Sequence, residues 1–311
     1  MREVLPGFGI VGGCECQFYS GGFNHTYRVR TEDGITYYLR AYRKPWRTLV
    51  DIQYELELLN HLKRKGFPVP QPIPYRDGQY FCAVPAPEGL RYLALFSEAI
   101  GKGISYEQEP EQVARCYGQA VAQLHHALDD FTSTFPRFHL DIRHFIDQPL
   151  YHITPFLAHR PADWRFVQQF AERLRGHLLR LPASQLELGA CHGDLQGYHA
   201  NVDSNGTLTF FDFDCCGLGF RAYDLAVFRW ASRLKEKEEV WWEPFLRGYL
   251  EVRPISDQNI RAIPWFVAGR YLWHVWLHTT NAGDWGHGWL DEAYFNRFIK
   301  NLHAVETDYK L

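Results

Sequence analysis

The hydrophobic pattern changes its period about a third of the way along the chain, and this change limits the folds that the sequence can adopt. Side-chain character alternates from residue to residue, as in strands, over residues 14–18, 26–30 and 35–43, and 91–96 is a further apolar strand. From about residue 113 onward, apolar residues recur at helical spacing instead. A β-rich first third followed by a helical remainder predicts two lobes with a cleft between them.

The lobe boundary is expected after residue 96. Segment 97–108 loses the strand pattern and carries two glycines, so the N-lobe is predicted over 1–96 and the C-lobe over 97–311. The N-lobe then holds a sheet of the five-stranded type and one helix. The C-lobe is helical, with helices expected over 113–124, 164–181, 223–235, 258–280 and 291–305.

Charge and composition exclude several classes of protein. With 33 Lys and Arg against 36 Asp and Glu, the net charge is −3, so no broad positive field favours nucleic acid or an anionic membrane. No apolar run reaches the ~18 residues of a membrane span, and stretch 263–277 is interrupted by Arg270 and His274. The seven cysteines lack paired zinc-site spacing, which indicates reduced thiols in a cytoplasmic protein.

The predicted N-lobe helix, 48–65, carries a charged residue within its apolar stripe. Leucines and an isoleucine recur every three or four positions, and at about 100° per residue Glu55 falls inside this arc while Glu57 falls outside. A carboxylate that points into a packed face needs a partner. Arg40, in the middle of the preceding strand, is the candidate.

A compact non-helical segment, 190–218, interrupts the helical part of the chain. It begins with His192-Gly193-Asp194 and ends with a short hairpin that leads to Asp212 at the end of a strand. Two carboxylates on the two sides of such a unit suit a metal-assisted transfer: one orients a hydroxyl and takes its proton, and the other binds Mg²⁺. A hairpin with a glycine-bearing tip near residue 21 adds a candidate phosphate grip.

These motifs together resemble the aminoglycoside phosphotransferase-like family, which includes choline kinases, homoserine kinases and a bacterial stress-response Ser/Thr kinase. The most specific match is His-Gly-Asp-Leu at 192–195 followed by Asp-Phe-Asp at 212–214. The hairpin tip 20–24 and the segments 117–127 and 221–226 match as well. The resemblance runs from about residue 15 to about 305. It implies an α+β, bilobal, protein-kinase-like fold with a small β-rich N-lobe and a larger helical C-lobe.

The resemblance also implies roles for individual residues. Asp194 would be the catalytic base or would position the acceptor hydroxyl, and Asp212 would bind the Mg²⁺ that bridges the ATP phosphates. Arg40 would contact the phosphates, with Glu55 as its ion-pair partner; its fork geometry differs from that of lysine. The backbone N–H groups at the hairpin tip would cover the phosphates, contributed by Ser20, Gly21 and Gly22.

Other positions follow from the same resemblance. Residues 93–97, with Leu95 at their centre, would form the hinge that holds adenine. His192 and Asp224 would support the catalytic loop. The polar loop 280–288 is the expected acceptor site in the C-lobe.

One position departs from the family pattern. The family places Asn five residues after the catalytic Asp as the second metal ligand, and here that position is His199, while the nearby asparagine is Asn201. Asn201 could act through a longer loop, His199 could replace it, or the second metal site could be lost; Mg²⁺ prefers oxygen ligands to imidazole. Asp214 could add to the metal site or make a structural hydrogen bond.

The expected function is an ATP- and Mg²⁺-dependent phosphotransferase that acts on the hydroxyl of a small molecule. The alternatives are a protein Ser/Thr kinase of the stress-response type and a non-catalytic nucleotide-binding pseudokinase. Only residues 213–220 separate Asp212 from the next helix, so no long activation segment is expected, which favours a constitutively assembled enzyme. The expected partners are a nucleotide and a hydroxyl-bearing acceptor, without nucleic acid or membrane.

Overall fold

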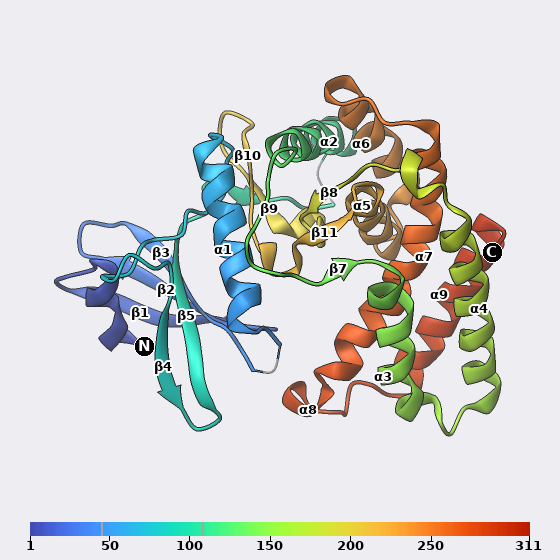
Figure 1. Cartoon of the computed structure of the whole chain (residues 1–311), viewed down its shortest axis with the longest axis horizontal. Coiled ribbons are helices and arrows are strands. Elements are labelled where there is room, and N and C mark those ends of the chain that lie inside the picture. Colours follow the sequence, from blue (N-terminus) through green and yellow to red (C-terminus); the bar gives the residue numbers. More distant parts are fainter. Residues whose placement is uncertain (45, 107–108) are drawn as a thin grey trace. The chain divides into compact units, whose positions relative to one another are not determined.

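The computed structural model describes residues 1–44, 46–106 and 109–311, which form two compact units (Figure 1). Unit 1 comprises Met1–Ile104, Asp130–Arg137 and Tyr198–Asp214. Unit 2 comprises Ser105–Asp129, Phe138–Gly197 and Cys215–Leu311. The end of the loose segment expected over 97–108 lies outside the described residues.

Unit 1 is built on a five-stranded antiparallel sheet in the order β1-β2-β3-β5-β4. Its strands are β1 (Cys14–Gly21), β2 (His25–Thr31), β3 (Thr36–Ala41), β4 (Cys82–Ala86) and β5 (Gly89–Ser97). One face is packed by the short helix η1 (Arg2–Phe8), which inserts Leu5 and Phe8 against Val29, Leu39 and Leu95. Because side chains alternate along a strand, Arg40 is directed to the other face of β3.

Helix α1 (Leu49–Arg64) runs beside this sheet (Figure 1). It begins with a capping box, in which the Thr48 hydroxyl accepts from the Asp51 N–H and the Asp51 carboxylate accepts from the Thr48 N–H. Gly66 follows the helix at φ +71°, a left-handed conformation that glycine adopts without strain. Apart from Leu49, the helix buries the predicted apolar stripe together with Glu55.

A second, smaller sheet completes unit 1. Its order is β10-β9-β6, with strands β6 (Lys102–Gly103), β9 (Ala200–Val202) and β10 (Leu208–Phe210). Asp203 tightens the turn between β9 and β10, because its carboxylate accepts from the backbone N–H groups of Asn205 and Thr207. Segments about 100 residues apart in the sequence, β6 and the β9–β10 hairpin, thus form one sheet within unit 1.

Unit 2 is mainly helical. Its helices are α2 (Pro110–Ala127), α3 (Gln148–Leu157), α4 (Pro161–Arg180), α5 (Ala222–Leu234), α6 (Glu238–Val252), α7 (Asp257–Thr280), α8 (Ala282–Trp285) and α9 (Glu292–Tyr309). Shorter helical turns are η2 (Arg143–Asp147), η3 (Ala183–Gln185), η4 (Gly197–His199) and η5 (Phe213–Cys215), of which η4 and η5 span the borders between the units. A small sheet, ordered β7-β11-β8, contains β7 (His139–Leu140), β8 (Leu188–Cys191) and β11 (Gly217–Phe220).

Two glycines allow α2 and α6 to approach closely. A Cβ on Gly118 would lie 2.0 Å from the Phe245 carbonyl oxygen, and a Cβ on Gly248 would lie 2.0 Å from that of Arg115. Any side chain at either position would force the helices apart. This packing supports the helix end that carries His125, which belongs to the site described below.

The predicted fold class is confirmed: a β-sheet N-terminal region is followed by a helical C-terminal region. The sequence did not indicate β4, α3 or α6. The boundary between residues 96 and 97 stays a prediction, and the contact-based units assign later segments to unit 1 as well. None of the helices in the described part of the chain is both long and apolar enough to cross a membrane.

Candidate active site

A cavity of about 540 Å³ lies within unit 1. This is within the range of about 300–1,000 Å³ that is usual for small-molecule and cofactor sites. Both sheets of the unit and α1 contribute to its wall, which includes Ser20, Thr26, Tyr38, Arg40, Glu55, Phe96, Ser97, Glu98, Ala99, Tyr198, Asn201 and Asp212. The wall therefore combines aromatic and apolar surface with a small group of charged side chains.

Arg40 and Glu55 form an ion pair in this wall. Arg40 Nη1 lies 2.8 Å from Glu55 Oε1, and the Tyr42 hydroxyl donates to Glu55 Oε2 at 2.9 Å. The Glu55 side chain is 2% exposed, so the helical phase read from the sequence placed it correctly. Both of its oxygens have a donor, which is what a buried carboxylate requires.

The charges around Arg40 fix its protonation state. Burial opposes the charged guanidinium, but Glu55 and Asp212 more than offset this and hold the pKa of Arg40 well above its usual range. Burial and the Glu55 carboxylate raise the pKa of the Tyr42 hydroxyl well above its usual value. Arg40 therefore presents a permanent positive charge to the cavity.

Asp212 lies in the cavity wall beside Arg40. Its Oδ1 accepts from Arg40 Nη2 at 3.1 Å, and its side chain is 41% exposed. The backbone at Asp212 has φ +65°, a left-handed conformation that is uncommon for a residue other than glycine. Held in this way at the end of the β9–β10 hairpin, the carboxylate keeps accessible surface on the cavity side.

The two candidates for the second metal ligand lie in different surroundings. His199 Nε2 lies 3.8 Å from Asp212 Oδ2, so imidazole and carboxylate converge. Asn201 Nδ2 donates instead to the Ala99 carbonyl oxygen at 2.8 Å, in the part of the wall that follows β5. The side chain near the Asp212 carboxylate is thus that of His199, five residues after Asp194.

Asp214 is already engaged by structural donors. Its carboxylate accepts from Trp46 Nε1 at 2.5 Å and from Arg47 Nε at 3.0 Å, and its carbonyl oxygen accepts from Arg137. Trp46 in turn stacks on Phe23 at a centroid distance of 4.9 Å, next to the β1–β2 turn. These contacts favour the structural hydrogen-bonding interpretation of Asp214 over a metal-binding one.

The predicted phosphate loop lies at the end of β1, and the predicted hinge lies in β5; both belong to unit 1. Ser20 lines the cavity, Gly21 ends β1, and the Gly22 N–H donates to the Asn24 carbonyl in the turn. The Leu95 side chain is fully buried in the sheet core, and its carbonyl oxygen accepts from the Ile73 N–H. The cavity wall is formed by the residues that come next, 96–99.

The predicted catalytic loop around Asp194 lies in unit 2. Gly193 has φ +81°, and a Cβ there would lie 2.1 Å from the Cys215 carbonyl oxygen, so this position requires glycine. The buried Asp224 carboxylate accepts from the backbone N–H groups of His192 and Gly193, both at 2.8 Å. His125 Nε2 lies 3.2 Å from Asp224. Asp224 on α5 therefore holds the backbone of the two residues that precede Asp194.

The electrostatics of this support follow from burial. Burial would raise the pKa of Asp224, but the bonds from His125 and from the loop N–H groups lower it below its usual range. Burial lowers the pKa of His125, so its imidazole is neutral near pH 7. The support is a carboxylate held in place by neutral donors.

Asp194 itself contacts a residue that the sequence analysis did not include in the site. Its Oδ1 accepts from Gln196 Nε2 at 2.9 Å and from Arg270 Nη2 on α7. The side chain of Asp194 is 13% exposed and that of Arg270 is 1% exposed. The sequence did carry a signal, since Arg270 is one of two polar residues that interrupt the apolar run 263–277.

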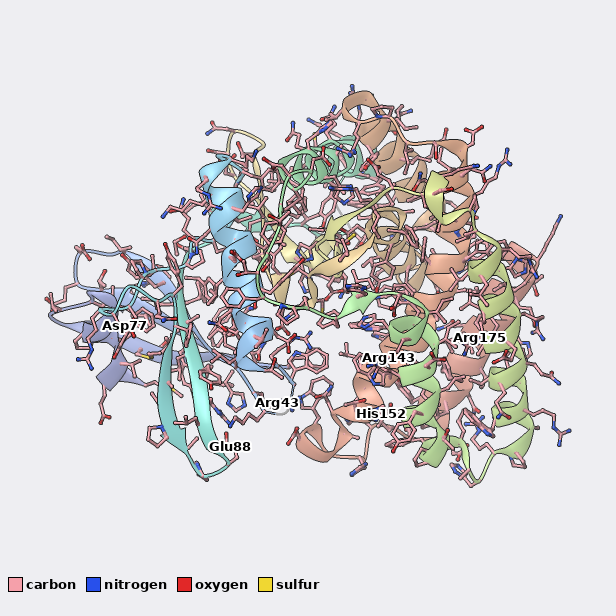
Figure 2. The ribbon with its side chains drawn as sticks, in the orientation of Figure 1. Arg43, Asp77, Glu88, Arg143, His152 and Arg175 are labelled. Atoms are coloured by element: carbon pink, nitrogen blue, oxygen red, sulfur yellow. The ribbon has the colours of Figure 1, made fainter. Side chains whose placement is uncertain are left out.

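The predicted acceptor loop, 280–288, contains the short helix α8 and adjoins an aromatic cluster. The His278 ring lies 4.8 Å from Trp289 and its Nδ1 lies 2.7 Å from the Tyr294 hydroxyl. His152 on α3, labelled in Figure 2, has its ring centroid 6.3 Å from that of Trp276. The role of the loop 280–288 as an acceptor site stays a prediction.

The donor set in unit 1 fits a divalent metal that is shared with a phosphate ligand. Among the described residues no group of three or more His, Cys, Asp and Glu could hold a metal ion alone. Asp212 and His199 offer a carboxylate and an imidazole that converge, and phosphate oxygens would complete the coordination. A metal that arrives with a nucleotide matches this arrangement.

Comparison with known proteins gives the class of this fold and then the family. The solved structure of the amicoumacin kinase hAmiN in complex with AMP-PNP, Ca²⁺ and Ami superposes with a TM-score of 0.81 at 20% identity, and covers 97% of this chain and 92% of that chain. The fold is therefore the bilobal protein-kinase-like fold.

The family model described as "Phosphotransferase enzyme family" matches residues 15–259. The chain belongs to this family and is a phosphotransferase. An uncharacterized protein of Deinococcus radiodurans is 38% identical over 278 residues, which are 88% of this chain and 80% of that protein. Amicoumacin kinase of Bacillus subtilis is 24% identical over 268 residues, which are 83% of this chain and 78% of that protein.

Proposed function

We propose that the protein transfers the γ-phosphoryl group of ATP, with Mg²⁺, to a hydroxyl group of a small molecule. The observation that carries this proposal is the cavity of unit 1, in which Arg40, Glu55 and Asp212 are joined by two ion pairs. A fixed cation beside an accessible carboxylate is what the polyphosphate and its metal require.

The nucleotide would occupy this cavity. Its base would lie against Phe96 and the backbone of residues 97–99, and its phosphates would extend toward Ser20 and Arg40. Arg40 is held by Glu55, so its guanidinium is already oriented before the nucleotide binds. Pre-orientation of this kind lowers the entropic cost of binding a flexible triphosphate.

Asp212 and His199 are the residues that would hold the metal. When bound, Mg²⁺ neutralises phosphate charge and so stabilises the loose transition state of phosphoryl transfer. The geometry at His199, 3.8 Å from Asp212, supports its assignment as the second ligand ahead of Asn201. Asn201 would then contribute to the floor of the nucleotide site.

Asp194 would orient the acceptor hydroxyl and accept its proton. Its loop is fixed by Asp224, and its carboxylate is fixed by Gln196 and Arg270. Little covalent chemistry is needed from the protein in such a transfer, so positioning of this kind supplies much of the catalysis.

The segment after Asp212 supports a small-molecule acceptor rather than regulation by an activation loop. Residues 213–220 fold directly into η5 and β11, and α5 begins at Ala222. A protein Ser/Thr kinase activity and a non-catalytic nucleotide-binding role are the two outcomes against which the proposal is tested.

The test incubates purified protein with γ-labelled ATP, Mg²⁺ and a lysate of the source organism, and separates small molecules from proteins. Asp194→Asn is the inactive variant, and Asp257→Asn, an exposed residue at the start of α7, is the matched control. Label in the small-molecule fraction that requires Asp194 supports the proposal. Label in the protein fraction would point to a protein kinase, and AMP-PNP binding without any transfer would point to a pseudokinase.

A further inference from the structure

Arg270 is a buried cation in the middle of α7 whose polar contacts converge on the catalytic loop. Its side chain is 1% exposed. Nη1 donates to the Gly193 carbonyl oxygen at 3.2 Å and to the Tyr223 hydroxyl at 3.1 Å, and Nη2 donates to Asp194 Oδ1. One guanidinium therefore holds both the backbone before Asp194 and the Asp194 side chain.

Aromatic rings fix the plane of this guanidinium. Its central carbon lies 3.9 Å from the Trp273 ring centroid and 4.8 Å from that of Trp230. Stacking on rings of this kind stabilises a desolvated arginine and leaves its edge for hydrogen bonds. With the plane set by the rings and the edge directed at the loop, Arg270 has little rotational freedom.

A buried charge of this kind is costly unless it is paired, and Asp194 is the carboxylate that pairs with it. Replacing such a pair with apolar residues is often neutral or stabilising for a fold. Stability alone therefore gives little reason to place a cation here, whereas orientation of Asp194 gives a direct one.

We propose that Arg270 is a positioning residue for phosphoryl transfer: it fixes one oxygen of Asp194 so that the other has a set direction for the acceptor hydroxyl. This inference rests on the proposed function. The guanidinium and the Gln196 amide both engage Oδ1, so the carboxylate is held from two sides. A catalytic carboxylate that rotates freely would spend most of its time away from the productive geometry.

The same contact places a permanent positive charge beside the Asp194 carboxylate. Several titratable groups face this pair: burial raises the pKa of Tyr117 on α2 and of Tyr223 on α5, and burial lowers the pKa of His274, one turn after Arg270. Cys215, His192 and His278 face the pair as well. Without the guanidinium, the Asp194 carboxylate would take up a proton more readily as the pH falls.

The experiment compares Arg270→Met and Arg270→Lys with a matched control, Arg261→Met, an exposed arginine earlier on the same helix. The assay is label transfer to the acceptor fraction defined above, with kcat and KM measured from pH 5 to 9. Binding of AMP-PNP, which uses unit 1, and the thermal unfolding midpoint report whether each variant is folded.

Arg270→Met is expected to lower kcat about 100-fold, the size of effect that a small misplacement of a catalytic group produces. AMP-PNP affinity should stay within threefold of wild type. The acid limb of its pH–rate profile should move to higher pH, because the favourable charge is gone. Arg270→Lys keeps the charge, so it should retain the wild-type acid limb while it loses part of kcat, and Arg261→Met should match wild type.

Two results would overturn the inference. In a folded Arg270→Met protein, a kcat within threefold of wild type would exclude a positioning role, and a lowered kcat with an unmoved acid limb would indicate a purely structural one. Absence of transfer by the wild-type protein would instead refute the proposed function, and this inference with it.

Discussion

Replacing Glu55 with alanine removes the carboxylate that neutralises Arg40 inside unit 1. The pair is short, 2.8 Å, and the Glu55 side chain is 2% exposed. Breaking a buried ion pair on one side costs about 3–5 kcal/mol, and the lost hydrogen bond from Tyr42 adds about 1 kcal/mol. Arg40 keeps its contact with the half-exposed Asp212, which offsets part of this loss. We therefore expect the free energy of unfolding to fall by about 3 kcal/mol.

The same substitution should weaken nucleotide binding. An Arg40 that has lost Glu55 is drawn to Asp212, its other carboxylate partner, and Asp212 is then less available to a metal. We expect the affinity for AMP-PNP with Mg²⁺ to fall about tenfold, equivalent to about 1.4 kcal/mol.

Urea denaturation followed by circular dichroism measures the first effect, and calorimetric titration with AMP-PNP measures the second. Glu57→Ala is the matched control, since Glu57 lies two residues away on α1, outside the apolar stripe, and accepts only from the Ser133 hydroxyl among the contacts described. It should cost less than about 1 kcal/mol. If Glu55→Ala unfolds at the same urea concentration as Glu57→Ala, the buried ion pair does not hold unit 1 together as argued.

Three other predictions concern the metal site and the pH dependence of folding. His199→Ala should raise the Mg²⁺ concentration for half-maximal activity about tenfold, whereas Asn201→Ala should raise the KM for ATP; equal effects on Mg²⁺ would contradict the assignment of His199. Asp212→Asn should remove the metal dependence of AMP-PNP binding, which calorimetry with and without Mg²⁺ detects. Burial lowers the pKa of His278 to about 4, so the unfolded chain binds a proton there that the folded protein does not between about pH 6.5 and 4. The free energy of unfolding should therefore decrease as the pH is lowered through this window, by at most about 1.4 kcal/mol per pH unit. The slope of unfolding free energy against pH should be smaller in His278→Gln and unchanged in the exposed control His139→Gln.

Local patterns in the sequence predicted much of unit 1. The alternation of residues 35–43 and the phase of the 48–65 helix are properties of neighbouring residues, and they placed Arg40 and Glu55 together as the structure has them. Gly66, directly after the predicted helix, follows the end of α1 in the structure as well, whereas the capping box at Thr48 is a finding of the structure.

Contacts between distant parts of the sequence could not be predicted in this way. Arg270 lies 76 residues from Asp194, and although it interrupts an apolar run, nothing in the local sequence indicates which carboxylate it contacts. The surroundings of His199 and Asn201, the two candidates for the second metal ligand, depend on contacts between distant segments. Asn201 on β9 lies opposite Gly103 on β6, and its side chain donates to the Ala99 carbonyl oxygen. The structure buries the side chain of Leu95 in the sheet core, and its place in the hinge stays a prediction.

Because unit 1 is made of separate segments of the chain, its parts are synthesised at different times. Ile104 ends its first segment, but β9, β10 and Asp212 belong to its last segment, Tyr198–Asp214. At roughly 5–20 residues per second, a ribosome needs about 5 to 20 seconds to translate from one to the other. For that interval the five-stranded sheet lacks part of the wall of the proposed nucleotide cavity, so the nascent chain would not yet have that site. A fragment that ends at residue 104 would therefore not form a complete nucleotide-binding module.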